Sequence, residues 1–278
     1  MAAGRVAGSA IVRPEGLEGM IGPWPYRLQL AGGWLDQPFM SSVNPNPPGS
    51  MVVVGVEPTF RYLDRCGMAT GTRAVAQRLW PDGIPSDREP MSVIRELYAV
   101  ENANLVEPSG SQDMCGLVLP GINRLDYDVS IDGGWFPSHI ESCTDPDVAA
   151  WLESVLHLVP VAPRPAGYAP LGIKRLDPDW VERLSASGKA CYDAIVGRDL
   201  DMLGESLNET MRCWEHLLPH TVAHPTIEID LVGLLRVYQQ ASAGAMYSGC
   251  GGGYLLVAAD HEVPGSLHVT VRSAGSQE

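Results

Sequence analysis

A glycine-rich segment near the C-terminal end of the chain has the composition of a loop that could approach a ligand closely. Five of the ten residues at 244–253 are glycine, and an apolar run at 254–259 follows them. Glycine has no Cβ, so such a backbone can take positive φ and lie against another group at short range. The apolar run is typical of a buried strand. The same composition also fits a glycine-rich hairpin, so this segment alone does not decide between binding and structure.

Two further segments combine glycine with polar side chains. Residues 27–38 read RLQLAGGWLDQP, and residues 108–113 read PSGSQD and lead to Gly-Ile-Asn at 121–123. In this order, the three segments resemble the motifs of the GHMP family of small-molecule kinases, and above all its sugar-kinase branch of heptose-7-phosphate kinases and fucokinases. There the motifs read roughly R-x-x-x-A-G-G-x-x-D, G-x-Q-D with a G-G-x-N turn, and G-A-K-x-x-G-x-G-G-G. The resemblance spans about residues 25–260, and only the combination of motifs is specific.

The resemblance implies a catalytic pair, Asp113 and Arg27. Transfer of a phosphoryl group to an alcohol needs a carboxylate beside the attacking hydroxyl, which orients it and accepts its proton. The family gives this role to the aspartate that corresponds to Asp113, and Arg27 would pair with it or with phosphate. The structural alternatives are a turn in which Asp113 caps backbone amides, and a strand charge at Arg27 that contributes little.

The resemblance also implies a site for ATP and Mg²⁺. Mg²⁺ prefers a few carboxylate or hydroxyl oxygens together with phosphate oxygens, and the residues implied as its ligands are Glu101 and Thr70. An ordinary solvated helix position is the alternative for Glu101. Phosphates are expected at the N-terminus of the helix that follows the loop at 66–73. The residues expected to contact ATP are Gly67, Thr70, Gly71, Thr72, Ser248, Gly249, Gly251 and Gly252.

The acceptor implied by the resemblance is a sugar or sugar-like polyol. Its expected contacts are Asp36, Gly33, Trp34, Gln112 and Asn123. A carboxylate such as Asp36 can accept short charge-assisted hydrogen bonds from two sugar hydroxyls. Trp34 could stack on a sugar ring or could lie in the core or at a rim. The sequence leaves open which substrate binds and which hydroxyl reacts.

Departures from the family pattern keep a second function open. Ala69 stands where the phosphate loop has its second glycine, and Met246 stands where lysine is usual. Residues 37–65 form a shorter stretch than the family has there, where strands shape the adenine pocket. The main interpretation is an ATP- and Mg²⁺-dependent kinase of a sugar or sugar-like small molecule. The alternative is a degenerate GHMP fold that binds a sugar or nucleotide without phosphoryl transfer, and a repurposed fold with other chemistry has no positive support.

The elements that must position these residues are mixed strands and helices. Strands or extended segments are expected at 26–31, 50–56, 117–127, 152–161, 254–259 and 267–272. Helices are expected at 71–80, 90–105, from 177 onward, 199–216 and 229–241. This order suits an α+β protein. The resemblance implies a two-lobed GHMP-kinase-like fold, with an unassigned segment at 1–22, a ribosomal-protein-S5-like N-terminal lobe at 23–165 and a ferredoxin-like C-terminal lobe at 166–278.

Composition excludes several other classes of protein. The formal net charge of −14 argues against a broad surface for nucleic acid or anionic membranes. No G-x-x-x-x-G-K-[ST] motif occurs, which excludes a P-loop kinase. The six cysteines are scattered and form no C-x-x-C pair, as expected of reduced thiols. Without a signal-peptide pattern or a membrane-length apolar run, we expect a cytoplasmic protein. The sequence gives no indication of oligomeric state.

Overall fold

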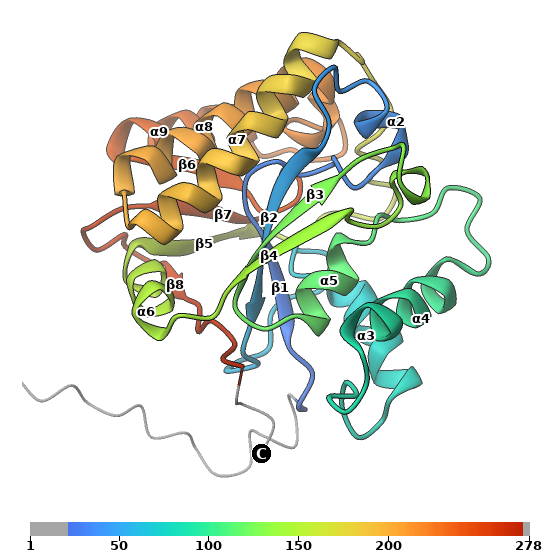
Figure 1. Ribbon diagram of the computed structural model, residues 1–278. Helices are drawn as coiled ribbons and strands as arrows, with labels where there is room; N and C mark the ends of the chain where they lie inside the picture. The colour runs from blue at the N-terminus through green and yellow to red at the C-terminus, as the bar shows by residue number, and fades with distance from the viewer. Residues whose placement is uncertain (1–21, 275–278) are drawn as a thin grey trace, which may run out of the picture.

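The computed structural model describes residues 22–274, and its framework is two four-stranded antiparallel sheets (Figure 1). The segment assigned to no lobe, 1–22, lies outside the described residues apart from its last position. The first sheet has the order β1-β2-β3-β4, with β1 at Tyr26–Gln29, β2 at Gly49–Val56, β3 at Ile122–Tyr127 and β4 at His139–Cys143. The second has the order β6-β7-β5-β8, with β5 at Leu156–Ala162, β6 at Gly244–Tyr247, β7 at Gly253–Ala258 and β8 at Leu267–His268.

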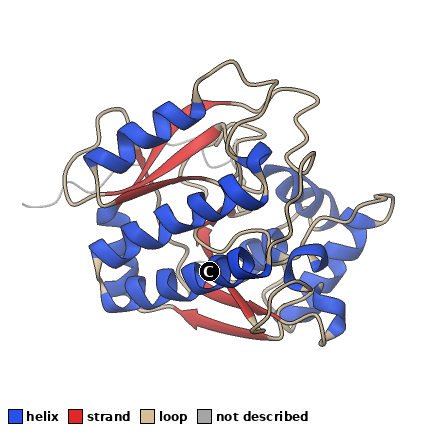
Figure 2. Ribbon diagram, turned by 90° about the horizontal axis from the view of Figure 1, so that it is seen from above, coloured by secondary structure: helices blue, strands red, loops and turns tan. Residues whose placement is uncertain are grey.

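Helices pack on both sheets. They are α2 at Pro38–Ser41, α3 at Thr70–Leu79, α4 at Pro90–Asn102, α5 at Gln112–Val118, α6 at Pro146–Val155, α7 at Pro178–Gly197, α8 at Leu200–Leu217 and α9 at Leu231–Ala241, with short 3₁₀ turns η1 at Asp132–Gly134 and η2 at Pro219–Thr221. Helix α7 packs against β2 and β3, whereas its neighbour α8 packs against β6 and β7. This helix pair, labelled in Figure 1, therefore connects the two sheets. Figure 2 shows helices lying between the two groups of strands.

Strand β2 lies between two hydrophobic cores, because successive side chains of a strand point to opposite faces of the sheet. Val52 and Val54 belong to a core that extends to the second sheet and to α7 and α8, where Trp214 is fully buried. Met51 and Val53 belong to a core shared with α3, α4 and α5. The position of β2 thus fixes the helices that carry the predicted catalytic residues relative to the second sheet.

The α+β architecture predicted from the sequence is confirmed, and so are most helix positions. Helix α7 begins at Pro178, and the side chain of Asp177 accepts a hydrogen bond from the Asp179 amide, as the Asp-Pro pair predicts. Two predictions of extended structure were wrong in part, because the segment 117–127 begins inside α5 and the segment 152–161 begins inside α6. Strand β5 precedes the lobe boundary expected at residue 165 and pairs with the C-terminal strands β7 and β8.

Within residues 22–274, no helix combines the length and the apolar character that crossing a membrane requires.

Candidate active site

A cavity of about 740 Å³ lies where β1, α2, α3 and α5 meet. The predicted site residues that line it are Arg27, Trp34, Asp36, Gly67, Thr70, Gly71, Gln112, Asp113 and Gly249. Three sequence segments far apart in the chain therefore converge on one space.

Asp113 and Arg27 form an ion pair in this cavity. Asp113 lies in the first turn of α5, and the guanidinium of Arg27 reaches it from β1. Arg27 is buried, and burial lowers its pKa to about 10, so it still carries its charge at neutral pH. Two of its N–H groups, at Nε and Nη1, are buried without a partner among the described residues. Arg27 can therefore orient Asp113 and still donate to an anionic ligand.

A chain of hydrogen bonds links Asp113 to Glu101 through Thr72. The Thr72 hydroxyl lies 3.1 Å from Oε1 of Glu101 and 3.4 Å from Oδ2 of Asp113. Ser109 also donates to Oε1 of Glu101, at 3.3 Å. Burial raises the pKa of Glu101, and the bonds from Thr72 and Ser109 oppose that rise. The second oxygen, Oε2, is buried without a partner among the residues described, and Glu101 lies behind the residues that line the cavity.

The donor set fits Mg²⁺ only in the company of phosphate. Residues 22–274 contain no group of three or more His, Cys, Asp or Glu side chains placed to hold a metal ion. Mg²⁺ on a nucleotide needs only one or two protein oxygens, because phosphate and water supply the rest. Glu101 meets that need. The structure does not bring Thr70 to Glu101: the Thr70 hydroxyl accepts a bond from the Arg65 amide at 3.3 Å, and Thr72 occupies the position beside the carboxylates.

The loop before α3, at 66–69, enters the helix through left-handed backbone. Gly67 and Ala69 both have positive φ, at 81° and 54°. Ala69 therefore carries the left-handed strain that glycine would avoid, about 1–2 kcal/mol. A Cβ added to Gly71 would meet nothing within 4 Å, so the N-terminus of α3 opens onto free space. The amides of a helix N-terminus are a general site for anions.

The C-terminal glycine segment contributes less to the cavity than expected. Only Gly249 and Cys250 of this segment line it. The Ser248 hydroxyl instead donates to the carbonyl of Gly67 at 2.7 Å, and Gly251 donates to the carbonyl of Thr221 at 2.5 Å. Gly252 also lies outside the lining. Ser248 thus contacts the loop before α3 and Gly251 contacts the turn η2, and the three residues Ser248, Gly251 and Gly252 do not line the cavity.

Arg164, which the sequence did not single out, holds the glycine segment. Its guanidinium donates to the carbonyls of Ser248 at 2.6 Å, Cys250 at 2.7 Å and Gly251 at 3.2 Å. The Arg164 amide also donates to the carbonyl of Arg65 at 3.2 Å, and Nε of Arg65 donates to the carbonyl of Arg164 at 2.9 Å. Arg65 lies in the segment that leads to α3. A Pro-Arg-Pro sequence indicates only a loop, so no local pattern could have found this role.

Asp36 and Trp34, which are predicted to bind the acceptor molecule, lie on the loop after β1. Asp36 is 1% exposed and accepts a hydrogen bond from Nε2 of Gln112 at 3.4 Å. Burial raises the pKa of Asp36 to about 6, while the Gln112 amide and the charge of Arg27 lower it. Trp34 lines the cavity with its indole N–H buried and unpartnered among the described residues.

Two of the expected acceptor contacts lie elsewhere. Gly33 does not line the cavity, and its carbonyl accepts a bond from the indole of Trp214 at 3.2 Å. Asn123 is fully buried in β3, where its amide donates to the carbonyl of Pro120 at 3.1 Å and its oxygen accepts from Ser142 at 2.6 Å. Its side chain is saturated by neighbours at the start of the strand and has no reach to the acceptor.

Solved structures of small-molecule kinases share this fold. The chain resembles a D-glycero-D-manno-heptose 1-phosphate kinase from Bacteriodes thetaiotaomicron, with a TM-score of 0.51, 12% identity and coverage of 90% of this chain and 96% of the other. The chain also resembles a mevalonate kinase from L. major, in complex with R-mevalonate. The TM-score is 0.57 and the identity 13%, and the match covers 91% of this chain and 95% of the other.

A third solved structure, a putative sugar kinase from Campylobacter jejuni, gives a TM-score of 0.55 at 11% identity, with coverage of 90% and 95%. No protein-family model and no curated protein matches the sequence. At these identities the likeness confirms the predicted fold alone, and function has to be argued from the site.

Proposed function

We propose that this protein is a kinase that transfers the γ-phosphoryl group of ATP, with Mg²⁺, to a hydroxyl of a sugar or sugar-like small molecule. The observation that carries the proposal is the position of Asp113. It is paired with Arg27, joined through Thr72 to Glu101, and faces a cavity that also contains the N-terminus of α3 and the buried carboxyl of Asp36.

Each side chain has a distinct task in this mechanism. Asp113 accepts the proton of the attacking hydroxyl and orients its lone pair. Arg27 keeps Asp113 in place and offers its free N–H groups to charge that develops on the transferred group. Asp36 and Gln112 hold other hydroxyls of the acceptor, which restricts its orientation.

The remaining groups would hold the nucleotide. Glu101 supplies an unpartnered oxygen for the metal, and the amides at the N-terminus of α3 supply positive partial charge for phosphate. ATP and Mg²⁺, when bound, supply the phosphoryl group and the charge that offsets its oxygens. The residues of the chain contribute position and charge, which is the main requirement for phosphoryl transfer.

A specific feature favours the alternative, a fold that binds a sugar or nucleotide without transfer. Only the irregular segment 57–69 connects β2 to α3, so no additional strand lies there to form a base pocket. A second cavity of about 320 Å³ adjoins this segment and shares Thr70 with the first. It is lined by Tyr26, Arg61, Tyr62, Asp64, Thr70, Arg73, Ala74 and Gln77.

Calorimetry with Mg-ATP, with and without EDTA, tests the proposal. We expect metal-dependent binding in the micromolar range, followed by ADP release in a screen of sugars and polyols. Absence of binding would refute the kinase and leave the non-transferring alternative. Binding of Mg-ATP without ADP release for any acceptor would favour a nucleotide-binding protein instead.

A further inference from the structure

Apolar side chains surround part of the cavity that contains Asp113. They come from α2, from the loop between α4 and α5, from the residue after η1 and from the segment before α7, and they are Phe39, Leu105, Val106, Trp135 and Leu171. These segments adjoin one another: α2 packs against η1, and the side chain of Gln37 donates to the carbonyl of Pro108 at 3.5 Å. The groups proposed to accept the proton and to bind phosphate and metal, in contrast, come from β1, α3, α4 and α5.

Two of these side chains gain little from the fold itself. Leu105 is 50% exposed and Val106 is 99% exposed. Figure 1 shows their loop, between α4 and α5, projecting from the body of the molecule. Neither side chain belongs to a core, so their hydrophobic surface contributes to stability only when something else covers it.

The same part of the cavity carries a cation on an aromatic ring. The Lys174 ammonium lies 4.3 Å from the centre of the Phe39 ring and also lines the cavity. A sugar hydroxyl turned toward Phe39, Leu105 or Val106 would meet no group that accepts or donates a conventional hydrogen bond, which is unfavourable. An alkyl or aryl group would instead bury apolar surface on both sides.

We propose that the acceptor is an amphiphilic alcohol. Its hydroxyl-bearing part binds at Asp36 and Asp113, and an aryl or alkyl substituent lies against Phe39, Leu105 and Val106. This inference rests on the proposed acceptor site and goes beyond it, because it replaces a free sugar by a polyol with an apolar substituent. The group that contacts this apolar wall is therefore a substituent of the acceptor molecule. The competing possibility is that the base of the nucleotide binds there.

Competition binding on the purified full chain tests this inference. The probe is 8-anilinonaphthalene-1-sulfonate, whose rings suit the apolar wall and whose sulfonate suits Lys174. The competitors are 3-phenoxypropane-1,2-diol and glycerol, which share two hydroxyls and differ by the phenyl ether. We expect the phenoxy compound to displace the probe at a concentration at least tenfold lower than glycerol does.

Two variants locate the effect. In the double variant Leu105→Ser with Val106→Ser, the advantage of the phenoxy compound should fall to within threefold. Both side chains are exposed, so the variant should unfold at the wild-type temperature, which a melting curve checks. The control is Val237→Ser in α9, an exposed valine remote from this cavity, and it should keep the full advantage.

Several results would overturn the inference. These are no binding of the probe to the wild-type chain, equal displacement by the two diols, or an advantage that survives in the double variant. Displacement of both probe and phenoxy compound by Mg-ATP would assign the apolar wall to the nucleotide base. A chain that releases no ADP but retains the variant-sensitive advantage would lose the proposed phosphoryl transfer and keep the amphiphilic site.

Discussion

Asp113, the proposed proton acceptor, is also the counter-ion of a buried cation. Its side chain is partly exposed toward the cavity, whereas its partner Arg27 is almost fully buried. Removal of the negative charge therefore leaves a buried cation without its counter-ion, and that cation is the more expensive member of the pair.

Replacement of Asp113 by asparagine tests its role as the base. The amide keeps the size of the side chain and can still accept a bond from Arg27, but it cannot take up a proton. We expect kcat to fall by about 10²–10⁴-fold with little change in the KM for ATP. Steady-state ADP release measures both constants. Glu107→Gln, at an exposed carboxyl of the same cavity, is the matched control, and unchanged kcat in Asp113→Asn would refute the assignment.

A second prediction concerns the pH dependence of stability and rests on the carboxyl of Asp36. Its pKa in the folded protein is about 6, above the value of 3.8 that an unperturbed aspartate has. The folded state therefore holds this proton more tightly than the unfolded state. The stabilisation is fully present below about pH 4 and is lost as pH rises through 6, up to a limit of about 3 kcal/mol.

The Asp36→Asn variant lacks this titration. Relative to wild type, its free energy of unfolding should therefore rise as pH goes from 4 to 7, by about 1–3 kcal/mol. Urea denaturation at several pH values measures the difference. Parallel curves for the two proteins would show that the carboxyl titrates normally in the folded state.

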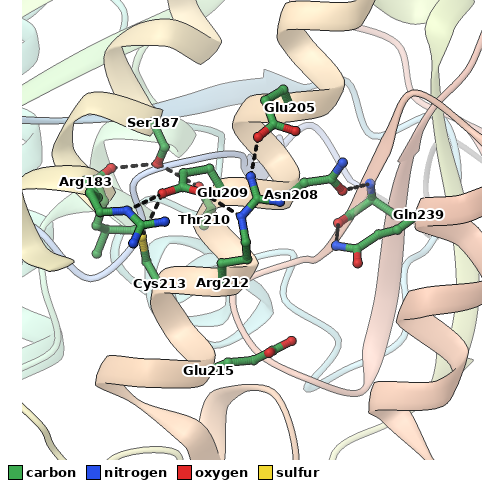
Figure 3. A network of polar contacts seen from close by, with 12 residues as sticks. Arg183, Ser187, Glu205, Asn208, Glu209, Thr210, Arg212, Cys213, Glu215 and Gln239 are labelled. Carbon is green, nitrogen blue, oxygen red and sulfur yellow. Dashed lines mark hydrogen bonds and ion pairs between the residues drawn. The ribbon is translucent and has the colours of Figure 1, made fainter.

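At the scale of elements, helix α8 positions the loop that carries Asp36. The Thr210 hydroxyl accepts a hydrogen bond from the Gly32 amide at 3.2 Å and lies 2.9 Å from the Ser187 hydroxyl of α7. One turn further on, Trp214 donates to the carbonyl of Gly33. Figure 3 shows Thr210 and Ser187 beside a more exposed group of ion pairs that includes Arg183, Glu209 and Arg212.

Thr210→Val should loosen this loop without removal of any group from the cavity. Valine matches the shape of threonine but leaves the buried Gly32 amide without its acceptor, at a cost of about 1–3 kcal/mol. We expect weaker acceptor binding with unchanged affinity for Mg-ATP, and titration of each ligand measures this. Glu205→Gln, at an exposed position of the same helix, should change neither stability nor binding. Equal loss of both affinities in Thr210→Val would indicate a general structural defect.

The sequence predicted elements well where capping residues or periodicity mark them. Helices α7 and α8 have Asp caps and amphipathic spacing, and the start of α7 and both ends of α8 were placed to within a residue. Helix α5 was not predicted, because Met114 to Val118 are all buried and no polar face reveals the helical period. The cap of α6 was present as Asp145 before Pro146, and this pattern could have identified the helix.

In the candidate site, too, residues marked by a local sequence pattern were predicted and residues that depend on tertiary contacts were not. The motifs brought Asp36, Asp113 and Arg27 to one cavity because each sits at a fixed offset on β1, its following loop or α5. Arg164 and Lys174 were not predicted, since their partners are backbone carbonyls and a ring that lie far away in the chain. Contacts of this kind depend on tertiary packing and leave no spacing in the sequence.

At the scale of the whole molecule, the segment after β8 connects both sheets to the helix that carries Asp113. Strand β8 pairs with β5 of the second sheet, and Val271 forms a bridge with Val56 of β2 in the first. The guanidinium of Arg272 then donates to the carbonyls of Leu117 at 2.5 Å and Val118 at 3.0 Å. These carbonyls end α5, where a cation is favourable to the helix dipole.

Arg272→Met should therefore affect the molecule as a whole. Arg272 is buried, so its loss leaves the carbonyls at the end of α5 without donors, and we expect a destabilisation of about 2–4 kcal/mol. Denaturation followed by tryptophan fluorescence and by far-ultraviolet circular dichroism measures this, and the two signals should shift together if the segment connects both sheets. Lys189→Met, at an exposed i,i+4 ion pair on α7, is the control and should cost less than about 1 kcal/mol. A shift in only one of the two signals would show that the sheets unfold independently, and that the C-terminal segment stabilises only the part of the molecule whose signal moved.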